Sequence, residues 1–126
     1  MVGHTLVVVH GATHPNDVDW EIYLAALRRN IAVIEAQLIV TDGGSPNSAQ
    51  RRASLEPAAG RPVPPTAVVT SSVLARGAVT ALSWFMKDRI RAFRQSEFDE
   101  ACAFIGTTAE KGVLRDTVTR LRATLT

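Results

Sequence analysis

Short apolar segments alternate with helix-like segments along most of this chain. The stretch 66–106 shows the pattern most fully, with two strand-like segments, each followed by a helix-like segment. Four strands are predicted, over residues 6–9, 36–41, 67–70 and 90–93. Strands that alternate with helices pair in parallel through right-handed crossovers. The sequence therefore predicts an α/β fold with a four-stranded, mainly parallel sheet, crossover helices and an additional C-terminal helix.

Size and composition limit the class of protein. A chain of 126 residues, 46% of them hydrophobic, is the usual size of a single domain with one core. No apolar run approaches the roughly 20 residues that cross a bilayer, and a strand begins almost at the N-terminus, so we expect neither a membrane span nor a signal peptide. The single cysteine, Cys102, excludes an intrachain disulfide and fits a reducing, cytoplasmic compartment.

Charge argues against nucleic acid as a partner. The formal net charge is only +2. The basic pairs Arg28-Arg29 and Arg51-Arg52 lack the interleaved aromatic residues of a nucleic-acid surface. We expect both pairs to lie on solvated helix faces.

Capping residues mark the predicted helices. Asn16 is expected to cap the first helix, which ends near Asn30. Ser45 precedes Pro46, a favoured first helical residue, and so predicts the start of the second helix. Ser96 and Thr107 resemble capping-box residues, with Gly106 as a helix stop between them.

Two helices show an apolar face that should pack on the sheet. The first helix would use Trp20, Tyr23 or Leu24, Leu27 and Ile31. The third helix, which follows Ser71 and Ser72, would use Val73, Leu74, Gly77, Ala78, Ala81, Leu82 and Phe85. Gly77 is expected to allow close approach of this helix to the sheet.

Polar residues follow three of the predicted strands. They are His10 with Gly11, the loop Asp42, Gly43, Gly44 and Ser45, and Thr70 with Ser71 and Ser72. In open parallel sheets, ligands bind outside the carboxyl ends of the strands, near a switch in strand order. These loops are therefore the candidate switch or ligand site.

The third unit also carries a family resemblance. The segment TAVVTSSVLARG at 66–77, with IRAF at 90–93 and EFDEA at 97–101, resembles the SpoIIAA-like group of STAS and Sec14-related domains, and the similarity extends over residues 7–105. The resemblance implies a βα superhelix. In the best-known branch of the family it also implies a non-enzymatic switch that binds an anti-sigma factor or a kinase.

That branch is phosphorylated on a serine at the start of the helix after a central strand. Ser45 is the residue that best matches this position, at a helix start where free N–H groups favour phosphate. In the switch branch, however, serine follows the aspartate almost at once, whereas here Gly43 and Gly44 separate Asp42 from Ser45 and Pro46 follows. A plain helix cap is therefore the favoured role of Ser45.

Other chemistries at the same edge are less well supported. A hydrolase-like enzyme could use His10, Asp42 and Ser71, but the chain has no G-x-S-x-G motif after a strand. Asp42 also stands where receiver domains carry their phosphate acceptor, yet the acidic pair that binds magnesium is replaced by His10 and Gly11. His10, His14 and Asp42 are loosely spaced for a metal site, and the glycine loop lacks a P-loop lysine. We expect no metal and no cofactor.

Two further segments suggest contacts with partners. In the last helix Leu114, Val118, Leu121 and Leu125 form a narrow apolar stripe, which would cover the chain's own sheet or, less favoured, dock on another subunit. Trp84, Phe85 and Met86 are consecutive in a helix and cannot all face one core, so at least one should lie near a surface. Trp84 and Phe85 are therefore candidate interface residues.

These patterns together favour a non-enzymatic regulatory or protein-interaction module. Its partner would be another protein or a second copy of the chain, and it would be switched at the loop from Asp42 to Ser45. The first alternative is a carrier of a small apolar or lipidic ligand, in the manner of Sec14-related proteins. The second is the enzyme described above.

Overall fold

The computed structural model describes residues 1–11, 15–43, 47–55, 64–84 and 88–124. Four strands are present in this part of the chain: β1 (Thr5–His10), β2 (Ala36–Thr41), β3 (Thr66–Thr70) and β4 (Ile90–Phe93). The α-helices are α1 (Asp17–Asn30), α2 (Ser48–Leu55), α3 (Val73–Ser83), α4 (Phe98–Phe104) and α5 (Lys111–Ala123). Two short 3-10 turns, η1 (Gln95–Glu97) and η2 (Thr108–Glu110), precede α4 and α5.

The strands form one parallel sheet in the order β1-β2-β3-β4. This confirms the predicted α/β fold, and the strands lie within one residue of their expected bounds. Every strand pairs with the next strand in the sequence, so the described sheet contains no switch in strand order. The expectation that a ligand would bind near such a switch therefore has no counterpart in this topology.

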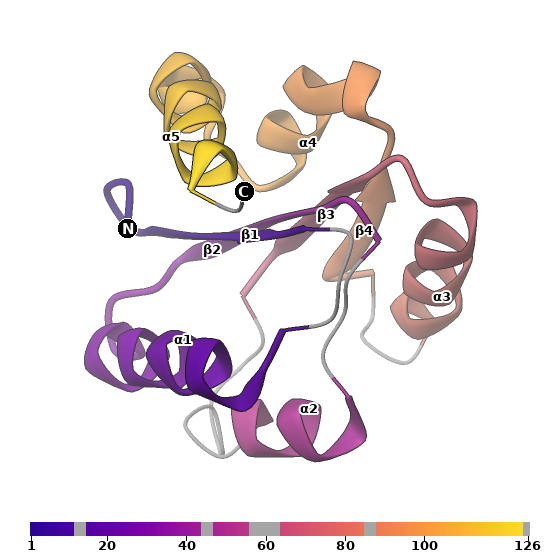
Figure 1. Ribbon diagram of the computed structural model, residues 1–126. Coiled ribbons are helices and arrows are strands. Elements are labelled where there is room, and N and C mark those ends of the chain that lie inside the picture. Colours follow the sequence, from indigo (N-terminus) through magenta and orange to yellow (C-terminus); the bar gives the residue numbers. More distant parts are fainter. Residues whose placement is uncertain (12–14, 44–46, 56–63, 85–87, 125–126) are drawn as a thin grey trace.

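Helices cover the two faces of the sheet, with α4 and α5 on one face and α1 and α2 on the other (Figure 1). The first face forms the larger core, in which Leu38, Val69 and Phe93 of the sheet meet Cys102 of α4 and Leu114 of α5. A smaller core on the opposite face contains Leu6, Trp20, Leu24 and Leu27. All five residues of β3 are buried, as expected for a central strand with helices on both sides.

Helix α5 covers the chain's own sheet. Leu114 is fully buried and Val118 nearly so, both in the core above the strands, while Leu121 is half-buried. Leu114 and Val118 therefore pack within the chain, as the favoured interpretation of the stripe required, and are not available for a contact with a second subunit. Leu125 lies outside the described residues.

Several predicted helix ends are observed. The Asn16 side chain accepts a hydrogen bond of 2.8 Å from the Asp19 N–H at the start of α1, and Ser72 caps α3 through the Ala75 N–H at 3.2 Å. Gly106 ends α4 with a positive φ of 74°. The N–H groups of Gly106 and Thr107 donate to the carbonyls of Ala103 and Cys102, which is a Schellman motif.

The caps of two other helices differ from the prediction. Helix α2 begins at Ser48. Asn47 and Gln50 form a reciprocal capping pair at this end, in which the N–H of each residue donates to the side chain of the other, at 2.9 and 2.8 Å. The expected start at Ser45 and Pro46 lies outside the described residues. Before α4, the predicted cap was Ser96. Instead, the side chain of Glu97 accepts a hydrogen bond of 2.8 Å from the Arg94 N–H, so the capping position is Arg94, two residues before Ser96.

The orientation of α3 is the main correction to the predicted packing. Its expected core face is open to solvent, with Val73 72% and Leu74 86% exposed, and Gly77 has no close neighbour for an added Cβ. The half-buried side chains are instead those of Ala75, Arg76, Val79 and Ser83. Helix α3 packs against β3 and β4, and the side expected to face the sheet is left open to solvent.

Candidate functional site

The carboxyl ends of β1, β2 and β3 meet at one edge of the sheet. The parallel register places His10 beside Thr41, and Thr41 beside Thr70. The candidate residues His10, Asp42, Gly43, Ser71 and Ser72 all lie at this edge. Gly44 and Ser45 fall outside the described residues, and so does His14.

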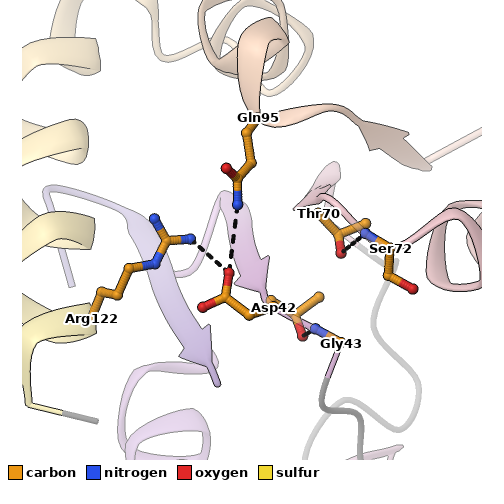
Figure 2. A network of polar contacts seen from close by, with 7 residues as sticks. Asp42, Gly43, Thr70, Ser72, Gln95 and Arg122 are labelled. Carbon is orange, nitrogen blue, oxygen red and sulfur yellow. Dashed lines mark hydrogen bonds and ion pairs between the residues drawn. The ribbon is translucent and has the colours of Figure 1, made fainter. Parts of the chain in front are cut away.

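Two threonines shape this edge in the same way. Thr41 accepts a hydrogen bond from the Gly43 N–H, and Thr70 accepts one from the Ser72 N–H, each at 3.1 Å (Figure 2). A threonine hydroxyl that holds an N–H two residues later stabilises a turn directly after a strand. The backbone at Gly43 has a φ of 122°, in the region that favours glycine.

Asp42 is held from two other segments of the chain. Its Oδ1 accepts from Nη2 of Arg122 at 3.1 Å and, more weakly, from Nε2 of Gln95 at 3.5 Å (Figure 2). The Asp42 and Arg122 side chains are each about one third to two fifths exposed. The Asp42 N–H also donates to the His10 carbonyl at 3.1 Å. The carboxylate is therefore engaged in a structural contact that joins β2, α5 and the turn before α4.

His10 belongs to the opposite face of the sheet. Its ring stacks on Trp20 of α1, with the ring centroids 6.2 Å apart and the planes at 21°. Burial lowers the pKa of His10 below its ordinary value of 6.5, because the charged imidazolium loses hydration there. His10 thus favours its neutral form and packs against an aromatic ring.

The neighbouring polar contacts fix the position of Trp20. Its indole N–H donates to the Gln50 carbonyl at 2.9 Å. The amide of Gln50 donates to the carbonyl of Pro15 and to the carboxylate of Asp17, at 3.0 and 3.1 Å. Gln50 is itself buried, so these bonds satisfy an amide that would otherwise be costly to bury. They link α2 to the start of α1 beneath the sheet.

The third strand end completes the candidate set. The Ser72 side chain caps α3, and the guanidinium of Arg76 donates to the Thr70 carbonyl at 3.0 Å. Ser71 is exposed. Of the residues of the hydrolase-like hypothesis, His10 and Asp42 therefore contact different helices, α1 and α5, on opposite faces of the sheet. This differs from a catalytic triad, in which a base must contact both the nucleophile and an orienting acid.

Within the described ranges, no group of three or more histidine, cysteine, aspartate or glutamate side chains could hold a metal ion.

Cys102 is fully buried in the larger core. Burial raises its pKa, and the nearby Asp99 acts in the same direction, while a hydrogen bond from Thr107 and the cations Arg115 and Lys111 oppose the rise. The neutral, unreactive thiol is favoured.

Sequence reasoning missed two residues of this edge, Arg122 and Gln95. Arg122 lies 80 residues from Asp42 in the chain, and no local pattern connects them. Gln95 belongs to a short turn that carries no motif. One feature of the sequence bears on Arg122, its location among basic residues in the last turn of a helix. This location predicts a favourable interaction with the helix dipole, and it does not predict a contact with Asp42.

Comparisons with protein-family models, curated proteins and solved structures found no match to this chain. The class of protein shown here is therefore that of the fold, a four-stranded parallel α/β sheet with a C-terminal helix. Across the residues described above, none of the helices combines the length and the apolar character needed to cross a membrane.

Proposed function

We propose that the chain is a non-enzymatic STAS/SpoIIAA-like module that acts by binding another protein chain in the cytoplasm. The observation that carries this proposal is the exposed apolar surface at α3, where Val73 and Leu74 at the start of the helix are 72% and 86% exposed and Trp84 at its end is 83% exposed. Tryptophan is strongly enriched among the residues that dominate binding at protein interfaces. Large exposed apolar patches commonly mark interaction sites.

The sheet edge supports binding better than catalysis. Asp42 is paired with Arg122, and His10 stacks on Trp20. Neither residue has the nucleophile and base geometry that the hydrolase-like alternative requires. Regulation through Ser45 remains a prediction, because Ser45 lies outside the described residues.

The carrier alternative needs an enclosed apolar cavity. A shallow depression is found on the outer surface of α1, lined by Asp17, Val18, Glu21, Ile22 and Ala25. All of its lining residues come from one helix, and it is open to solvent. This depression suits a surface contact better than the enclosure of a lipidic ligand.

Affinity capture with the purified chain tests the proposal. Wild type, Trp84→Ala and Val18→Ala would be immobilised, and the retained proteins, including further copies of the chain, would be compared by mass spectrometry. We expect a protein retained by wild type and by Val18→Ala to be lost with Trp84→Ala. Removing a dominant interface tryptophan costs about 2 kcal/mol or more, roughly a 30-fold change in Kd. Val18 is also exposed, at 72%, but on α1.

Identical sets of retained proteins from all three variants would argue against the proposal. Hydrolysis of p-nitrophenyl acetate or p-nitrophenyl phosphate provides the second readout. We expect rates equal to those without protein. Turnover that His10→Ala abolishes would favour the enzyme alternative instead.

A further inference from the structure

We draw no further inference here: the strongest candidate, the exposed apolar surface patch of Val73, Leu74, Leu82 and Trp84 on helix α3, carries none, because nothing in the described part of the chain shows what covers it.

Discussion

His10 illustrates how a single residue takes its role from the face of the sheet on which it lies. The residue ends β1, beside the polar strand ends that suggested a reactive site. Its ring, however, lies against Trp20 on the α1 side, whereas Asp42 contacts Arg122 on the α5 side. Burial lowers the pKa of His10, so protonation opposes folding at this position.

The pKa of His10 predicts a pH dependence of stability. Between its lowered folded value and 6.5, the unfolded chain binds more protons at His10 than the folded chain does. The free energy of unfolding should therefore fall as the pH decreases through about 6.5, and His10 should have no effect well above that pH. Urea unfolding at about pH 7.5 and about pH 5.5 measures the change.

The matched control is His10→Phe, which keeps a ring against Trp20 but does not titrate. The loss of stability between the two pH values should be smaller in this variant than in wild type, because the other titrating groups are unchanged. Equal losses in both proteins would show that His10 is as easily protonated in the folded chain as in the unfolded one.

At the scale of the elements, the helix ends follow local sequence closely and the helix faces do not. Asn16 and Ser72 cap the starts of α1 and α3, and Gly106 follows the end of α4, as their residue types predict. In contrast, α3 turns its most apolar side away from the sheet. A cap involves atoms within a few residues, whereas the rotation of a helix depends on everything that it packs against.

Two glycines give opposite predictions for the same substitution. Gly106 has a φ of 74°, so Gly106→Ala should lower the free energy of unfolding by about 1 kcal/mol. Gly112 lies in α5, where an added Cβ meets no neighbour. Gly112→Ala should raise the free energy of unfolding, by about 0.5 to 1 kcal/mol, through better helix propensity. Urea denaturation of both variants measures the two changes.

Each variant serves as the control for the other, since both add one methyl group at an exposed site. A stability change of the same sign in both would contradict the assigned backbone conformations. An unchanged Gly106→Ala would show that the turn after α4 contributes little to stability.

At the scale of the whole molecule, the ion pair between Asp42 and Arg122 connects parts of the chain 80 residues apart. It holds α5 to the carboxyl edge of the sheet at 3.1 Å. Nε of Arg122 is buried and hydrogen-bonds to none of the described residues, which reduces the net benefit of placing the guanidinium there. The pair should therefore help to position α5 while adding only modestly to stability.

A double-mutant cycle measures this coupling. With Asp42→Asn, Arg122→Gln and the double variant, we expect an interaction of about 0.5 to 1 kcal/mol in the free energy of unfolding, because both side chains are partly exposed. The coupling should shrink in about 1 M salt, which screens exposed charges.

The pair Glu21 and Arg28 on α1 is the control. Its atoms are 3.9 Å apart and both side chains are more than half exposed, so the same cycle should give a coupling near zero. Equal couplings for the two pairs would contradict the proposed role of Asp42 in holding α5.

The sequence alone determined the elements and their parallel arrangement. The apolar runs at residues 36–41 and 90–93, and the caps Asn16, Ser72 and Gly106, act through hydrogen bonds and torsions within a few residues. Alternation of strands and helices then requires parallel pairing. These features could be predicted because each depends on residues that are close in the chain.

The tertiary structure alone decided where side chains of the candidate site meet. Strand pleating sends His10 and Asp42 to opposite faces. Arg122 reaches Asp42 only because α5 packs across β1 and the larger core. Helix α3 packs on β3 and β4 in a rotation that leaves its apolar side open. Such contacts join distant residues through the packing of several elements at once, and no local sequence pattern encodes them.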